Sequence, residues 1–319
     1  MVIMSEQMPD QLPATDWPSR SLRLNCVGAG LVGKTLCHLM ARHIQLNQVI
    51  NQSQSSAQQA VDFIGAGRPF GIGSKPLTHL EPADIWMITC PDDLIESVGN
   101  KIIQSGRLQP GNIIFHCSGA ISSKIFQIPK LADISVASVH PVHSFSDPRS
   151  SLESFSGTPC AIEGDPKATT VLDDLFQSIG ADLFPINSES KSLYHASTVM
   201  ACNYLVSLLE LSKMMLSQAG VDHKNHSNPL KRLIEQTLGN YLTGDAQTAL
   251  TGPISRGDVD TIASHLTALE NAPSNWRKVY CSLGNIAADI SSKQSLASPQ
   301  SLQAITKLLN QKDADRKYD

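Results

Sequence analysis

Short apolar runs alternate with longer amphipathic stretches along the first 187 residues of the chain. The apolar runs are nearly continuous, which is typical of strands buried on both faces of a parallel sheet. Strands are therefore expected at 21–30, 47–51, 83–90, 112–119, 133–141, 158–164 and 181–187, and helices at 31–43, 55–65, 92–106 and 166–180. Strands and helices in alternation predict an α/β domain with a mostly parallel sheet.

The pattern changes after Asn187, where helical periodicity replaces the alternation. Residues 190–220 contain neither proline nor internal glycine and stop at Gly220, as expected of a long helix with a glycine cap. Further helices are expected at 228–243, 258–270, 275–293 and 298–312. We therefore predict a flexible leader over 1–20, an α/β domain over 21–187 and an all-helical C-terminal domain over 188–319, with a solvated tail at 313–319.

Composition narrows the possible classes of protein. Hydrophobic residues make up 41% of the 319 residues, enough for a sizeable core. The net charge of −4 and the lack of a long basic run disfavour nucleic-acid binding. We find no apolar run of about 18 residues and no secretory signal, so we expect a cytoplasmic protein without membrane spans. The seven scattered cysteines lack a CxxC pair, which predicts reduced, mostly buried thiols and no metal site.

A glycine-rich motif follows the first expected strand and opens the first expected helix. The sequence Gly28-Ala29-Gly30-Leu31-Val32-Gly33 is GxGxxG, which in this context is typical of a Rossmann domain that binds a dinucleotide. Gly28 allows the tight turn, Gly30 lets backbone N–H groups approach a pyrophosphate, and Gly33 lets the helix pack against the sheet. A second glycine cluster at 65–73 follows a helix, and we interpret it as a loop.

The end of the second strand predicts which nucleotide binds. NAD usually needs an acidic residue about 20 residues beyond the glycines, whereas this chain has Asn51-Gln52-Ser53. Without an acid there is no repulsion of a 2′-phosphate, and Asn51 and Ser53 can donate hydrogen bonds to it. We therefore expect NADP in preference to NAD, which remains possible; S-adenosylmethionine is less favoured because it normally needs an acid here too.

Other candidate contacts follow the later strands, since ligands bind at the carboxyl ends of strands in such sheets. Cys90 and Pro91 are expected at the cofactor, with Asp92 as a helix N-cap or a catalytic acid. Ser118 and Gly119 can face the nicotinamide or the substrate. A histidine at the end of the following strand, in the segment His140–Phe145, is either a proton donor or a structural group bonded to a neighbouring loop.

Polar residues interrupt the long apolar helix expected after residue 190. Lys191 and His195 lie four residues apart on one face, and Asn203 lies about two turns further. They form either a hydrogen-bonded core set or a substrate-facing set beside the nicotinamide. Arg256, in a turn-rich segment, can clamp a substrate carboxylate or phosphate, or pair with Asp258 or Asp245.

The chain resembles the superfamily of 6-phosphogluconate dehydrogenase-like proteins, and within it a bacterial family with a Rossmann-like domain followed by a domain of unknown function. The matching stretches run from about residue 22 to residue 270 and are VGAGLVG, CPDDLI, HCSGAISS, SVHPVHSF, FSGTPCAIEGD, LYHASTVMACNYLVSLLE, NPLKRLIEQTLGNYL and ALTGPISRGDVDTIASHL. The resemblance implies an NADP-dependent or deazaflavin-linked oxidoreductase. The family's second strand often carries an arginine before a serine, where this chain has Gln52 before Ser53.

Within the resemblance, Tyr194, His195 and Asn203 correspond to a tyrosine–histidine and asparagine–tyrosine motif. The superfamily's catalytic lysine lies four residues before an asparagine, a spacing that Lys191 does not have, so His195 is the better proton donor. We expect Ser118, His195, Asn203 and Arg256 to act on a small polar metabolite between the domains.

Two functions remain open at this point. The first is an NAD(P)-dependent oxidoreductase, and the second is a non-catalytic nicotinamide-nucleotide sensor or dimeric scaffold. Residues 188–300 carry more apolar surface than one helix stripe needs, which predicts a homodimer through the helical domain.

Overall fold

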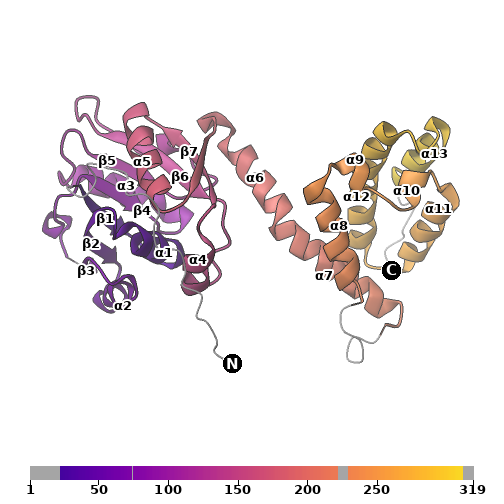
Figure 1. The fold of residues 1–319 in the computed structure, drawn as a ribbon, viewed down its shortest axis with the longest axis horizontal. Helices are drawn as coiled ribbons and strands as arrows, with labels where there is room; N and C mark the ends of the chain where they lie inside the picture. Colours follow the sequence, from indigo (N-terminus) through magenta and orange to yellow (C-terminus); the bar gives the residue numbers. More distant parts are fainter. Residues whose placement is uncertain (1–21, 74, 222–228, 312–319) are drawn as a thin grey trace, which may run out of the picture. The chain divides into compact units, whose positions relative to one another are not determined.

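The computed structural model describes residues 22–73, 75–221 and 229–311 of the chain (Figure 1). The expected leader over 1–20 and the tail over 313–319 lie outside these residues. Two compact units divide between Tyr204 and Leu205, whereas the sequence pattern placed the change at residue 187. The periodicity of the sequence indicates where strands give way to helices. The packing assigns the first of these helices, Lys191–Ala201, to the unit that contains the sheet.

The first unit contains one sheet of eight strands in the order β3-β2-β1-β4-β5-β6-β7-β8. All neighbouring pairs are parallel except β6 and β7, which are antiparallel. The strands are β1 (Arg23–Val27), β2 (Gln45–Asn51), β3 (Arg68–Gly71), β4 (Ile85–Ile88), β5 (Ile113–His116), β6 (Ser135–Pro141), β7 (Pro159–Gly164) and β8 (Asp182–Pro185). The predicted α/β Rossmann class with a mostly parallel sheet is confirmed.

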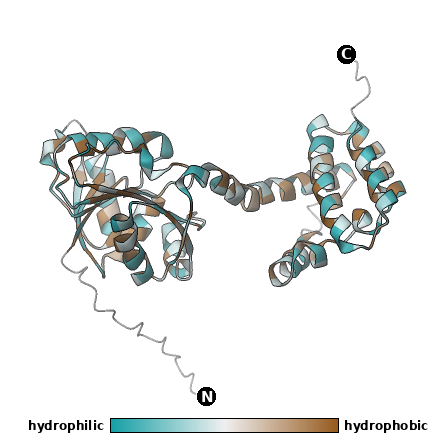
Figure 2. Ribbon diagram, turned by 90° about the horizontal axis from the view of Figure 1, so that it is seen from above, coloured by the Kyte–Doolittle hydropathy of each residue, from teal (hydrophilic) through white to brown (hydrophobic). Residues whose placement is uncertain are grey.

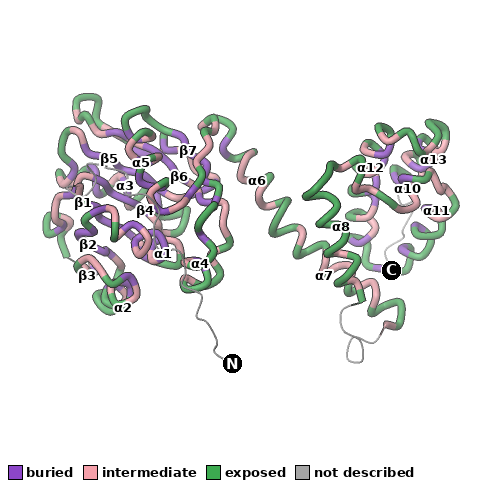
Figure 3. Tube along the Cα trace, in the orientation of Figure 1, coloured by how far each residue is buried: buried purple, intermediate pink, exposed green. Residues whose placement is uncertain are grey.

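Both faces of the sheet are covered, and alternate residues of one strand enter opposite cores. In β4, Ile85 and Met87 join the core on one face, while Trp86 and Ile88 join the core on the other. Figures 2 and 3 show the apolar, buried strands between more polar helices. The helices of this unit are α1 (Leu31–Met40), α2 (Gln54–Ile64), α3 (Asp92–Gln104), α4 (Pro148–Ser154), α5 (Pro166–Ser178) and α6 (Lys191–Ala201), with short 3₁₀ helices at Leu77–His79, Ser123–Ile125 and Ser188–Ser190.

In the sheet unit, one strand and one α-helix were not expected from the sequence; in the helical unit, the short helices α9 (Ala246–Ala249) and α10 (Pro253–Arg256) were not expected either. β3 lies inside the glycine cluster at 65–73, so the interpretation of that segment as a loop was wrong. Its four residues, partly exposed at the sheet edge, are too few to show a period, and pairing with β2 defines the strand. The helix α4 was also missed, although Asp147 caps it by accepting a hydrogen bond from the Ser150 N–H at 2.9 Å.

The long helix expected over 190–220 forms as two helices with a break at Cys202. These are α6 and α7 (Asn203–Gln218). By length and composition alone, the stretch Ser188–Gln218 is apolar enough to cross a membrane, with a mean hydropathy of 1.3 in its most apolar 18-residue window. No such span was expected from the sequence. Figure 3 shows α6 and α7 as mostly exposed or half-buried.

In its described residues the second unit contains helices and no strand, as predicted. It contains most of α7 and then α8 (Lys231–Thr243), α9 (Ala246–Ala249), α10 (Pro253–Arg256), α11 (Val259–Ala268), α12 (Ser274–Gln294) and α13 (Pro299–Leu309), with a 3₁₀ helix at Leu269–Asn271. Its core joins α11, α12 and α13 through Ile262, Cys281 and Ile305. The predicted N-cap at Asp258 is confirmed, since its side chain accepts from the Thr261 N–H at 3.1 Å.

Candidate functional site

The glycine turn joins β1 to α1 where the strand order reverses, since β2 and β4 lie on opposite sides of β1. Gly28 has φ +90°, and a β-carbon there would lie 2.6 Å from the Cys90 backbone nitrogen. A β-carbon on Gly33 would lie 2.5 Å from Thr89 Oγ1. Gly28 therefore makes the turn, and Gly33 brings the helix against the neighbouring strand segment, as the motif predicted.

The middle glycine borders open space. A β-carbon on Gly30 would meet nothing nearer than the Gly28 oxygen at 3.9 Å. The Gly30 N–H itself donates to that oxygen at 2.7 Å, so it serves the turn and not a ligand. The first bond from α1 back to the turn runs from the Lys34 N–H to Gly30. The earlier N–H groups of the helix, from Leu31 to Gly33, have no partner in the described chain, as at an anion-binding helix start.

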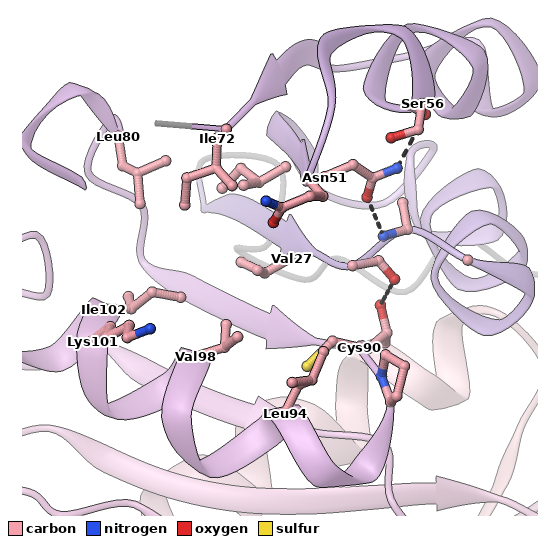
Figure 4. A pocket seen from close by; sticks show the side chains of 18 of the residues that line it. Val27, Asn51, Ser56, Ile72, Leu80, Cys90, Leu94, Val98, Lys101 and Ile102 are labelled. Carbon is pink, nitrogen blue, oxygen red and sulfur yellow. Dashed lines mark hydrogen bonds between the residues drawn. The ribbon is translucent and has the colours of Figure 1, made fainter. Parts of the chain in front are cut away.

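Asn51 ends β2 and ties the turn to the next helix. Its Oδ1 accepts from the Ala29 N–H at 2.7 Å, and its Nδ2 donates to the Ser56 carbonyl at 3.0 Å (Figure 4). Both polar groups of the side chain are therefore occupied within the protein. The second N–H of the Nδ2 group is not used in these two bonds, so donation from Asn51 to a cofactor phosphate stays a prediction.

A pocket of about 910 Å³ opens over the glycine turn, with an apolar floor and a cationic rim. Its apolar lining includes Ile72, Leu80, Leu94, Val98 and Ile102, some of which Figure 4 shows pointing into the cavity. Three lysines line it: Lys34 from α1, Lys75 from the segment after β3, and Lys101 from α3. Among the described residues, no aspartate or glutamate lines it. These lysines are 26 to 67 positions apart in the chain, so the sequence pattern gave no sign that they share a site.

Most of the expected cofactor contacts line this pocket. They are Gly28, Ala29, Gly30, Leu31, Val32, Asn51, Gln52, Cys90 and Pro91. Ser53 is not among its lining residues, because its hydroxyl caps α2 by accepting from the Ser56 N–H at 3.1 Å. Two other residues of α2 line the pocket, Ser56 in its first turn and Gln59 in its second.

Ser118 and Gly119 also lie outside the lining. The Ser118 hydroxyl is buried and donates to Asp92 Oδ2 at 2.8 Å, while accepting from the N–H groups of Ala120 and Ile121. Asp92 is thus the first residue of α3 and a partner of Ser118, with Pro91 at the cap position expected for Asp92. The Ser118 hydroxyl therefore ties its own loop to the start of α3, and its expected contact with the nicotinamide or the substrate stays a prediction.

Two histidines meet over Gly119, one residue beyond that contact. A β-carbon on Gly119 would lie 2.5 Å from His195 Cδ2 and 2.8 Å from His140 Nε2. The two imidazoles are 5.8 Å apart, edge to face. Burial lowers the pKa of His140 to about 4, helped by the nearby His195 and Lys191, so this imidazole is neutral at physiological pH.

A buried ion pair lies one helical turn before His195. Lys191 is 1% exposed, and its Nζ bonds the Ser138 hydroxyl and lies 3.5 Å from Glu163 Oε1. Glu163 also accepts from the N–H and hydroxyl of Ser123, each at 2.8 Å. Burial lowers the pKa of Lys191 against the opposing effect of Glu163. Of the two alternatives for the polar set, Lys191 fits the hydrogen-bonded core, whereas a substrate-facing role of the half-buried His195 stays a prediction.

The remaining candidates, Asn203 and Arg256, lie on later helices of the chain. Asn203 is exposed at the start of α7, after the break at Cys202. Arg256 is exposed at the end of α10 in the helical unit, where its charge helps to lower the pKa of Asp258 after the larger effect of hydrogen bonds from Thr261. Their participation with His195 remains a prediction.

The sheet order, the glycine turn and the pocket define a Rossmann-type α/β protein with a helical second unit. Residues 158–287 match the model of a domain of unknown function, DUF2520, which extends from β7 into α12. This match confirms the resemblance to a Rossmann-like family with a domain of unknown function. No curated protein matches the chain.

Solved structures share the fold. A Thermotoga maritima protein is 24% identical, with a TM-score of 0.68 over 85% of this chain and 99% of its own. A Bacteroides fragilis protein provisionally assigned as an NADP oxidoreductase is 18% identical, with a TM-score of 0.61 over 86% and 98%. A reductive aminase from Aspergillus terreus, in complex with NADPH and ethyl-5-oxohexanoate, is 12% identical, with a TM-score of 0.52 over 90% and 92%.

Proposed function

We propose that the protein is an NADP-dependent oxidoreductase acting on a small polar metabolite. The observation that carries this proposal is the pocket over the glycine turn, which combines free helix N–H groups with three lysines and, in the described chain, no acidic side chain. A dinucleotide with a 2′-phosphate carries more negative charge than one without, so such a rim favours NADP over NAD. The NADPH-bound aminase of the same fold adds support.

The lining fits the parts of the nucleotide. The open space at Gly30 and the start of α1 suit the pyrophosphate, and the apolar floor between Leu80 and Ile102 suits a planar base. The N–H groups of Ile72 and Gly73 bond the carbonyls of Asn51 and Gln52, each bond within 2.9 Å, so this segment lies at the end of β2. Lys75 therefore lies where a ribose 2′-phosphate is expected, and we propose that it binds this group.

Titration with NADPH and NADH, followed by nucleotide fluorescence, tests cofactor binding. We expect the wild type to bind NADPH at least tenfold more tightly, and Lys75→Gln to remove most of that difference by weakening NADPH alone. Lys167→Gln is the matched control, since this lysine lies outside the pocket, 3.9 Å from Asp133. No saturable binding of either nucleotide at millimolar concentration would overturn the proposal; equal binding by the wild type would overturn the preference for NADP.

Catalysis is favoured over a sensor role by the histidines next to the pocket. Bound NADPH or NADP supplies hydride transfer, and the protein must supply orientation and a proton or hydrogen bond. Pro91 lines the pocket, Asp92 holds Ser118, and Gly119 lies under His140 and His195. We propose that this side of the pocket receives the nicotinamide and the substrate, with His195 as a proton donor.

The test of catalysis is NADPH oxidation with a panel of carbonyl and imine metabolites. His195→Ala is expected to lower turnover at least a hundredfold while leaving the NADPH dissociation constant within twofold. Unchanged turnover would remove His195 from the mechanism. If the pure protein binds NADPH and oxidises it with no member of the panel, the sensor role becomes the better explanation.

We propose further that a second copy of the chain covers α6 and α7 in a cytoplasmic homodimer. Leu193 and Val206 are 76% and 68% exposed, and Met200 and Tyr204 are also exposed, although an apolar surface of this kind is normally covered. The buried ion pair of Lys191 with Glu163 holds the start of α6 against the sheet unit. Because this end of the apolar stretch is part of a folded unit, we favour a protein partner over a membrane as the cover of α6 and α7.

Light scattering tests the dimer, and cell fractionation tests the location. We expect a dimer in the soluble fraction, a monomer for Val206→Glu, and an unchanged dimer for Leu131→Glu, which replaces a leucine that is 98% exposed on the sheet unit. A monomeric wild type at micromolar concentration would refute the dimer, and recovery with membranes would refute the location.

A further inference from the structure

The loop that follows β5, residues 117–122, is held at its start through the buried Lys191. Lys191 bonds the Ser138 hydroxyl, and the oxygen of that hydroxyl lies 3.3 Å from the Ser118 carbonyl oxygen. An ammonium group can only donate, so the Ser138 oxygen accepts from Lys191 and its one proton is left for the Ser118 carbonyl. The charge on Lys191 therefore fixes the direction of both bonds and ties the start of the loop to α6.

The other member of the ion pair holds the end of the same loop. Glu163 lies 3.5 Å from Lys191 and accepts from the N–H and the hydroxyl of Ser123, the residue after the loop, each at 2.8 Å. The four side chains of this network are buried, none of them more than 6% exposed. Because water does not compete for these bonds, their directions decide where the loop lies.

A third contact ties the loop to the cofactor pocket. The Ser118 hydroxyl donates to Asp92 Oδ2 at 2.8 Å and accepts from the N–H groups of Ala120 and Ile121. Asp92 begins α3, and Pro91 before it lines the pocket. The carboxyl end of β5 lies at the same edge of the sheet as the glycine turn, on the side of β1 away from β2. Since the adenosine ribose is expected at the end of β2, the nicotinamide half is expected on the side of the loop.

We propose that Lys191 and Glu163 are positioning residues, which hold the loop 117–122 where the nicotinamide half of the bound dinucleotide requires it. The proposal rests on the proposed function, because it assigns a part of that cofactor to this side of the pocket. Both side chains are buried, so they act through Ser138 and Ser123 and not by contact with the cofactor.

Stability by itself does not explain the ion pair. Removing two charges from water costs much of what their attraction returns, and apolar residues of similar size often stabilise a fold equally well. Apolar residues cannot supply direction, whereas the ammonium group and the carboxylate each bond a second partner in a defined geometry. The double variant Glu163→Gln/Lys191→Met should therefore keep the fold and lose the hold on the loop.

Hydrogen exchange of the full-length protein, followed by mass spectrometry, tests this hold without any nucleotide. We expect the backbone N–H groups of residues 117–123 to exchange at least tenfold faster in the double variant than in the wild type. Ser138→Ala keeps both charges and removes the link to Ser118, so it should also speed exchange in the loop. Unchanged exchange in Ser138→Ala would overturn the proposal, whether or not the double variant folds.

An exposed ion pair in the same part of the chain provides the matched control. Lys124 and Glu189 carry the same charges and are 66% and 74% exposed. Exposed pairs of this kind contribute little. We expect Lys124→Met/Glu189→Gln to exchange as the wild type does; exchange as fast as in the double variant would show that any ion pair here has the same effect, and would overturn the role of the buried pair.

A binding titration tests the link to the cofactor. Adenosine 2′,5′-bisphosphate contains the phosphorylated adenosine half of NADPH without the nicotinamide. Ser138→Ala and the double variant should bind this compound within twofold of the wild type, but NADPH at least fivefold more weakly. Unchanged NADPH binding would overturn the positioning role, and so would an equal weakening of both compounds, which indicates a general loosening of the fold. If the wild type binds neither compound, the proposed function fails, and the exchange experiment distinguishes this result from failure of the positioning role.

Discussion

Gly28 and Gly30 lie two residues apart in the same motif, yet the structure separates their roles. An alanine at Gly28 would adopt φ +90° and would place its β-carbon 2.6 Å and 2.8 Å from backbone atoms of Cys90. An alanine at Gly30 would have φ −81° and no atom within 3.8 Å of its β-carbon. We therefore expect Gly28→Ala to impair the fold, and Gly30→Ala to impair nucleotide binding with little effect on the fold.

The magnitudes follow from the contacts. For Gly28→Ala, the strained backbone and the overpacking each contribute about 1–3 kcal/mol, so the free energy of unfolding should fall by about 2–6 kcal/mol. For Gly30→Ala, the change should stay within about 1 kcal/mol. The added methyl group would hold a pyrophosphate away from the helix N–H groups, and losing one charge-assisted hydrogen bond of about 1.5–3 kcal/mol weakens binding about 10- to 100-fold.

Urea denaturation measures the first quantity, and titration with NADPH measures the second. Both variants should be compared under the same buffer and salt conditions, because the phosphate contacts depend on ionic strength. If Gly30→Ala binds NADPH as tightly as the wild type, the pyrophosphate does not lie over this turn. If Gly28→Ala is as stable as the wild type, the close contact with Cys90 relaxes and the argument from steric overlap is wrong.

Three further predictions concern charge. His140 and His116 take up a proton near pH 6.5 in the unfolded state, whereas in the folded state their pKa values are about 4 and 3. The free energy of unfolding should therefore fall as the pH drops from 6.5 towards 4, by up to about 1.4 kcal/mol per pH unit for each histidine. In urea denaturation at a series of pH values, His140→Gln should reduce this slope, and an unchanged slope would contradict the buried neutral state. Glu163→Gln removes the countercharge of buried Lys191 and should lower the free energy of unfolding by about 3–5 kcal/mol. Adding Lys191→Met to this variant should restore most of that loss. Equal stability of the single and the double variant in urea denaturation would show that the pair is not coupled. Asn51→Asp places an acid at the end of β2 and should shift the preference from NADPH towards NADH in the binding titration. The free energy of unfolding should fall by about 1–3 kcal/mol, because a carboxylate oxygen then faces the Ser56 carbonyl. An unchanged ratio of the two dissociation constants would argue against placing the ribose at this strand end.

The sequence alone determined the α/β class and the positions of most elements, because burial on both faces gives each strand a continuous apolar run. The GxGxxG motif also identified its own geometry, since positive φ and close helix packing are local demands that glycine alone meets at Gly28 and Gly33. These features depend on neighbours in the chain. The edge strand β3 escaped because four half-exposed residues carry too little pattern, and its partner β2 decides its conformation.

Only the tertiary structure decided what surrounds each polar side chain. The Ser118 hydroxyl donates to the carboxylate of Asp92, 26 positions away in the chain, whereas the helix cap made by Ser53 is a local contact with Ser56. Lys75 reaches the pocket and His140 meets His195 over Gly119 because strands distant in sequence end at the same edge of the sheet. The hydrogen-bonding partner of a side chain depends on such long-range packing, which no spacing along the chain encodes.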